Sequence, residues 1–203
     1  MVSAKTPPAP GDPLYPMPPS LAPLDAVRGS ILVLDWRWLR ENALFEAYDK
    51  ALAERSLLAA AASDWVPIDA ALGHWDALEA LALPSTSIAE IGHFVGAHVH
   101  GAFLRTLVQL AGQLGTSPWA ALKQTQKLWE RSWRGGGVAI HRTGSSSAQI
   151  AVVKAAVARS PFFRGSFRGA VAEGIAPLCQ RPLIVELEEA RTPMSFTLRA
   201  SWV

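Results

Sequence analysis

The stretch FFRGSFRGAVAEG, residues 162–174, decides between two folds, because its glycines could serve a phosphate-binding loop or a closely packed helix. A dinucleotide-binding loop needs a strand that ends at the first glycine and a helix that opens at the third. Here the glycines come late after the run AVVKAAVA, and Gly165 and Gly169 are four residues apart, as on one helix face. Phe163 and Phe167 form an adjacent row. The stretch therefore predicts a helix with one small face for close packing and one aromatic face toward the core.

The segments on either side of this helix have the two-residue period of strands. VAIHR and AQIAVV flank the turn TGSSS at residues 143–147, and PLIVELEE and MSFTLRASWV close the chain. Earlier apolar residues recur at helical spacing instead, as in Ile68, Leu72, Trp75 and Leu78. Strands in adjacent pairs favour an antiparallel sheet. We expect an α+β fold in which N-terminal helices pack on a C-terminal antiparallel sheet of about four strands, built from two hairpins separated by a helix.

Residues 1–24 differ from the rest and are predicted to be a proline-rich disordered or extended tail, with residues 25–203 forming a single ligand-binding-like domain. Five prolines at a spacing of three would share one edge of a polyproline II helix: Pro7, Pro10, Pro13, Pro16 and Pro19. A partner with an aromatic groove could bind that edge. The alternative is a solvated, semi-rigid tail.

Composition narrows the classes of protein that the chain can belong to. The formal net charge of +2 is too small to indicate a nucleic-acid-binding protein. The one cysteine, Cys179, excludes an internal disulfide and a multi-cysteine zinc site, and it fits a reducing, cytoplasmic setting. No signal sequence is visible, and no apolar run approaches the roughly 18 residues of a membrane span.

A second helix is predicted from Pro118 to about Arg134, with Trp119, Leu122, Trp129 and Trp133 as its apolar stripe. Lys123, Lys127 and Arg131 repeat every four residues on its opposite side. This basic row could meet an anionic ligand or a protein partner, or it could be a solvated face.

No pattern of reactive residues indicates an enzyme, because nucleophile-elbow, Walker and HExxH motifs are all missing from the sequence. The segment HFVGAHVH is a poor metal site. His93 and His100 share a helix face but stand two turns apart, about 10.5 Å, while His98 and His100 do not face each other. We expect neither a metal nor a cofactor.

The C-terminal segments FFRGSFRGAVAEGIAPLC, PLIVELEEAR and MSFTLRASW are similar to the closing part of 4-vinyl-reductase-type domains. Residues 28–203, through RGSILVLDWRWLREN, SDWVPIDAALGHWDALE and GTSPWAALKQTQKLWERSW, also resemble an uncharacterised myxobacterial-type family related to those domains. The resemblance implies the superfamily of small-molecule sensors, haem-dependent nitric-oxide sensors and TRAPP small subunits, which pack helices on an antiparallel sheet and often dimerise. The sensors' zinc cysteines and the haem sensors' Tyr-x-Ser-x-Arg signature have no counterpart here, and Ser195 stands near one expected cysteine position.

Two functions of different class fit these observations. The first is a non-catalytic regulatory or sensor module that holds a small hydrophobic ligand between helices and sheet. Its expected ligand-binding residues are His100, Phe103, Trp129, Trp133, Phe163 and Phe167. The alternative is a protein–protein interaction or scaffold subunit, a homodimer that uses the proline-rich tail and the basic row to engage a partner.

Overall fold

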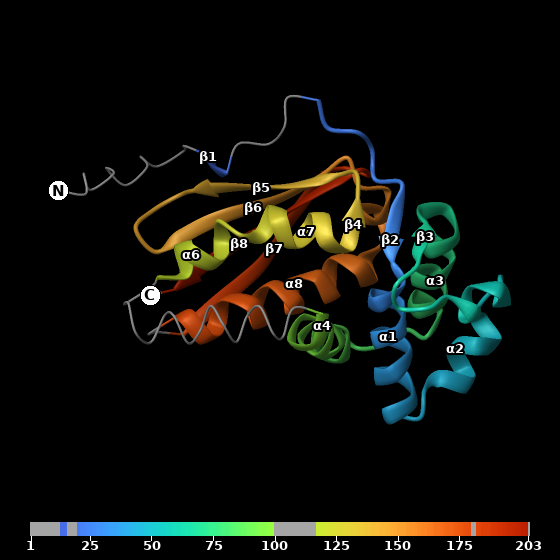
Figure 1. The fold of residues 1–203 in the computed structure, drawn as a ribbon. Helices are drawn as coiled ribbons and strands as arrows, with labels where there is room; N and C mark the ends of the chain where they lie inside the picture. Colours follow the sequence, from blue (N-terminus) through green and yellow to red (C-terminus); the bar gives the residue numbers. More distant parts are fainter. Residues whose placement is uncertain (1–12, 16–19, 100–116, 180–181, 203) are drawn as a thin grey trace.

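The computed structural model describes residues 13–15, 20–99, 117–179 and 182–202, and it has an antiparallel sheet with helices layered on one face (Figure 1). The strand order is β1-β5-β6-β8-β7. β5 (Gly137–Arg142) and β6 (Ser147–Val153) form the first hairpin, and β7 (Leu183–Thr192) and β8 (Ser195–Trp202) form the second. These four strands confirm the predicted α+β fold and its two hairpins.

The sheet has one apolar face because alternate side chains of its central strands point toward the helices. In the register, Ile150 of β6 lies between Ile140 of β5 and Leu198 of β8. All three side chains are fully buried, whereas the intervening residues Gln149 and Thr197 are partly exposed. The two-residue period read from the sequence therefore places the core on a single side of the sheet.

Helix α8 (Pro161–Ile175) connects the two hairpins and contains the stretch with three glycines. Ser160 caps it, because its hydroxyl accepts a hydrogen bond of 3.1 Å from the backbone N–H of Phe163, and Pro161 takes the first helical position. The stretch is therefore a helix, as the spacing of its glycines predicted, and not a phosphate-binding loop.

Helix α4 (Ser85–Val99) crosses α8 through glycines on both helices. A side chain at Gly92 would collide with the carbonyl group of Ser166, and one at Gly169 would collide with the carbonyl group of Ala89. The two backbones can approach this closely only because neither position carries a Cβ.

The N-terminal helices form a cluster beside the sheet: α1 (Gly29–Glu41), α2 (Phe45–Ala51) and α3 (Ile68–Ala80), with the single-turn helix η1 (Arg55–Ala59). A small sheet in the order β3-β2-β4 joins this cluster to the rest, through β2 (Ala26–Arg28), β3 (Trp65–Pro67) and β4 (Trp133–Arg134). Two short turns, η2 (Ala156–Arg159) and η3 (Ala176–Leu178), flank α8. The sequence patterns had not indicated the small sheet.

The helix predicted from Pro118 to about Arg134 is wrong in its extent. The chain instead forms α6 (Pro118–Leu122) and α7 (Thr125–Ser132), and Trp133 is extended and pairs with Val27 as part of β4. The helix ends early because this long-range strand pairing satisfies the backbone of Trp133.

The first described residues, β1 (Pro13–Tyr15), pair with the edge of β5, where Pro13 lies opposite His141. The chain is bonded to the domain at Leu21, because the Leu21 carbonyl accepts a hydrogen bond of 2.6 Å from the Lys154 ammonium. Pro7, Pro10, Pro16 and Pro19 lie outside the described residues, so the predicted proline edge stays a prediction. No helix in the described part of the chain is long and apolar enough to cross a membrane.

Candidate functional site

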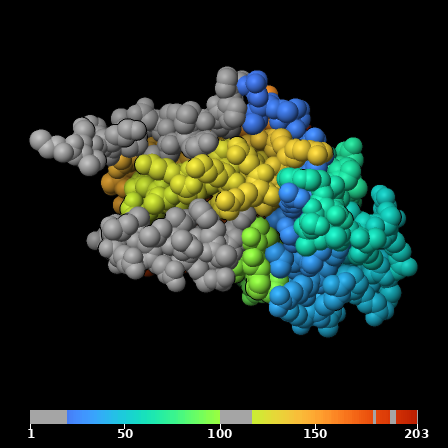
Figure 2. Space-filling view, in the orientation of Figure 1, coloured from blue at the N-terminus to red at the C-terminus, as the bar shows by residue number. Residues whose placement is uncertain are grey.

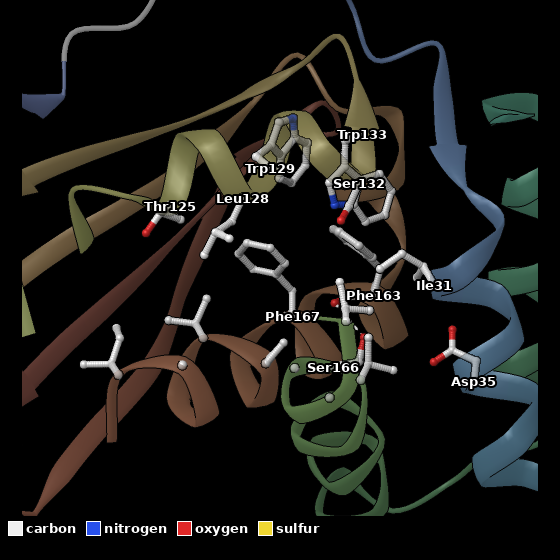
Figure 3. Close-up of a pocket in the computed structure, with 18 of the residues that line it drawn as sticks. Ile31, Asp35, Thr125, Leu128, Trp129, Ser132, Trp133, Phe163, Ser166 and Phe167 are labelled. Atoms are coloured by element: carbon white, nitrogen blue, oxygen red, sulfur yellow. Dashed lines mark hydrogen bonds between the residues drawn. The ribbon is translucent and has the colours of Figure 1, made fainter. Parts of the chain in front are cut away.

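A cavity of about 130 Å³ lies between α8, α4, α7 and α1 (Figure 3). Most of its described lining is apolar, with Val95, Leu128 and Val171 beside five large aromatic side chains. A cavity of roughly 150 Å³ with such a lining stays dry and can bind benzene. The space therefore has the size and character of a site for a molecule with about one aromatic ring.

The aromatic wall brings together four residues that the sequence predicted as ligand-binding. Trp129 and Trp133 stack with ring centroids 5.0 Å apart, and Phe163 meets Trp133 edge-on at 5.4 Å. Phe167 packs beside Phe163 at 5.7 Å. All four line the cavity, whereas the two remaining predicted residues, His100 and Phe103, lie outside the described residues.

The cavity persists because its walls are held from outside by rigid contacts. The glycine contacts fix the separation of α4 and α8, and the rings of Phe163 and Phe167 rest edge-on against Phe196 of the sheet. Aromatic side chains have few rotamers and cannot bend into a gap as methionine does.

Among the described residues, the lining has four polar side chains, contributed by α1, α7 and α8: Asp35, Thr125, Ser132 and Ser166. Asp35 reaches from α1 toward the cavity, and its residue is 4% exposed (Figure 3). Ser166 bonds its own helix, donating to the carbonyl of Phe163 at 3.2 Å. Asp35 is the single ionisable side chain among the described residues of the lining.

Behind Asp35 runs a buried chain of hydrogen bonds through three helices. Trp36 Nε1 donates to the Tyr48 hydroxyl at 3.0 Å. The Tyr48 hydroxyl and His74 Nδ1 are 2.7 Å apart, and His74 Nε2 lies 2.9 Å from Asp35 Oδ2. The indole can only donate, so every donor finds an acceptor when Tyr48 donates to Nδ1 and the Nε2–H of His74 donates to Asp35. The hydrogen bonds of the network therefore all run in one direction, and the last acceptor is the carboxylate of Asp35 at the cavity wall.

Burial sets the acid–base behaviour of this network. Loss of water raises the pKa of Asp35 above its ordinary value of 3.8, while the hydrogen bond and the charge of His74 act in the opposite direction. Burial also raises the pKa of the Tyr48 hydroxyl, so this group keeps its proton. The carboxylate at Asp35 is thus costly to bury and is supported chiefly by one imidazole N–H.

The other predicted residues lie away from the cavity. Lys123, directly after α6, and Lys127 and Arg131 of α7 are exposed, and their role in partner binding stays a prediction. Helices α6 and α7 form the yellow-green part of the surface in Figure 2. His93 lies 3.2 Å from a carboxylate oxygen of Glu173. Among the residues that the structure describes, no group of three or more His, Cys, Asp or Glu could hold a metal ion.

Comparison with solved structures connects this architecture to a known fold. A mutant H-NOX protein from K. algicida in its Fe(II) unliganded form superposes with a TM-score of 0.65 at 8% identity, covering 87% of this chain and 96% of that one. The chain shares the fold of H-NOX domains. An oxygen-binding H-NOX domain related to soluble guanylate cyclases, in its oxygen complex, gives a TM-score of 0.51 at 11% identity, covering 86% of this chain and 94% of that one. No protein-family model matches the chain, and no curated protein matches it.

The described residues do not fit the haem that this fold implies. None of those that line the cavity is a histidine, cysteine, methionine or tyrosine, the side chains that bind haem iron. His74 is buried nearby, but both of its ring nitrogens are engaged, by Tyr48 and Asp35. The stacked rings of Trp129 and Trp133 further reduce the space for a macrocycle.

The sequence reasoning missed Asp35, Tyr48 and His74. Asp35 is buried although it is polar, whereas its apolar neighbour Leu34 is partly exposed. A signal was present, because Asp35 stands four residues from both Ile31 and Leu39 and so shares their buried helix face.

Proposed function

We propose that this protein is a non-catalytic regulatory or sensor module that binds a small, mostly apolar molecule in the cavity between α8, α4, α7 and α1. The observation that carries the proposal is the aromatic cavity of about 130 Å³ between helices that pack on one face of the sheet. Ligand sites are mostly apolar with a few placed polar groups. The H-NOX fold of the chain and the gas- or haem-binding character of the solved neighbours add support.

A regulatory role is supported by the number of elements that one ligand would touch. The lining comes from α1 of the N-terminal cluster, from α4 and from helices on the sheet. A ligand that binds better to one arrangement of these elements shifts the population toward it.

A non-catalytic role is supported by the direction of the polar network. Asp35, His74 and Tyr48 have the order of a catalytic acid–base–nucleophile chain, but the carboxylate faces the cavity and Tyr48 is fully buried behind it. A nucleophile must reach its substrate. The arrangement suits binding rather than attack.

Toluene binding tests the proposal. At saturating toluene the melting temperature of the full chain should rise, because a ligand of the folded state stabilises it by mass action. Leu128→Phe should fill the cavity and abolish the rise. Leu187→Phe is the matched control, since Leu187 is 42% exposed on β7 and should leave the rise intact. A wild-type protein that toluene does not stabilise would contradict the proposal.

A further inference from the structure

Asp35 places one carboxylate oxygen where the structure provides no partner for it. His74 bonds Oδ2 at 2.9 Å, while no group among the described residues donates to Oδ1. The residue is 4% exposed and lines the cavity. Because Oδ1 is not a fully enclosed atom and Asp35 lines the cavity, a ligand there can reach this oxygen and donate a hydrogen bond to it.

The surrounding groups cannot supply that partner. Trp36 donates to Tyr48, Tyr48 donates to His74, and His74 donates to Oδ2 of Asp35. None of these hydrogen bonds reaches Oδ1. No arginine, lysine or histidine occurs among the described residues of the lining. Among the residues that the structure describes, the lining therefore offers no cation to the carboxyl group of Asp35.

We infer that the cavity takes a small apolar molecule that carries one protonated amine, with the ammonium group against Oδ1 of Asp35 and the apolar body among the aromatic rings. This inference rests on the proposed function and adds the class of ligand. Charge-assisted hydrogen bonds of this kind are about twice as strong as neutral ones.

The lining near Asp35 suits an ammonium group in two further ways. Ser132 of α7 is 3% exposed and also lines the cavity, so its hydroxyl oxygen can accept a hydrogen bond from a ligand. The rings of Trp133 and Phe163 also belong to the lining. Aromatic faces attract cations, most strongly when water is excluded.

Three probes of nearly equal size separate charge from shape. Benzylamine carries the ammonium, benzyl alcohol is its neutral hydrogen-bonding counterpart, and toluene lacks the polar group. Calorimetric titration of the full chain at pH 7 should give benzylamine an affinity at least about tenfold higher than that of toluene, equivalent to one charge-assisted bond. Asp35→Asn should remove this preference of the cavity for benzylamine over toluene.

The outcomes distinguish the two proposals. If toluene binds and benzylamine binds no better, the cavity is a ligand site but the amine inference is wrong. If benzyl alcohol binds as tightly as benzylamine, Asp35 recognises a hydrogen-bond donor rather than a cation, and the amine inference is again wrong. If none of the three binds, the proposed function itself fails. The wild-type comparison decides the matter even if Asp35→Asn does not fold.

Discussion

The two faces of α8 differ: one packs closely against α4, and the other borders the cavity. On one face, Gly169 packs directly against the backbone of Ala89 on α4, and Gly165 packs against the side chain of Ile88. On the other, Phe163 and Phe167 meet the stacked rings of Trp133 and Trp129 edge-on beside a cavity of about 130 Å³. Small residues let helices approach until no space is left, whereas large rigid rings meet at edges and leave gaps between them. The fold is therefore fixed at the glycine face, and the binding space is left at the aromatic face.

Substitutions on the glycine face should lower the free energy of unfolding the most. Gly92→Val would drive a side chain into the carbonyl group of Ser166, and we expect a loss of about 4 kcal/mol or more in the free energy of unfolding. Chemical denaturation followed by circular dichroism measures this. Gly73→Ala is the control, because a Cβ at Gly73 meets nothing within 4 Å. In a helix this change should stabilise by about 0.5–1 kcal/mol. Equal effects of the two changes would show that the crossing is not close-packed.

A substitution on the aromatic face should destabilise the protein less, but it should change which ligands the cavity binds. Phe163→Ala removes a ring that is 3% exposed and contacts Trp75 and Trp133, and we expect a cost of about 3 kcal/mol. The enlarged cavity should then bind naphthalene, which the wild-type cavity should exclude. Denaturation and fluorescence titration measure the two effects. If stability falls with no gain in naphthalene binding, the space has collapsed and the rings do not define it.

The polar end of the cavity should give the smallest effect, and one that depends on pH. Because burial raises the pKa of Asp35 above 3.8, the folded protein binds this proton more tightly than the unfolded chain, and stability falls as pH rises from 3.8 through the folded pKa. Asp35→Asn lacks this charge and keeps an acceptor for His74 Nε2. We expect the ligand-free variant to be more stable than wild type at pH 7, and this advantage to be smaller near pH 4.

Thermal melts across this pH range, analysed as the difference between variant and wild type, measure the effect. The ionisable groups that face Asp35 are His74 of α3 and, through it, Tyr48 of α2. Both remain in the variant. A difference that shrinks with rising pH would show that the network stabilises the carboxylate more than burial penalises it.

The sequence by itself determined the helix through residues 162–174, the two hairpins around it and the small face of Gly165 and Gly169. These depend on local spacing, because helices bring together residues four apart and strands alternate their side chains. The end of α7 could not be predicted, because Trp133 leaves the helix to pair with Val27, more than 100 residues earlier.

Only the tertiary structure decided the site. Asp35 and His74 are 39 residues apart and meet where α1 packs against α3, and no local period records that meeting. The same apolar residues at the same spacing would serve a filled core or a cavity. Which of the two forms depends on how far the walls can approach, and here the glycine crossing of α4 and α8 and the rigid rings of the aromatic face set that limit.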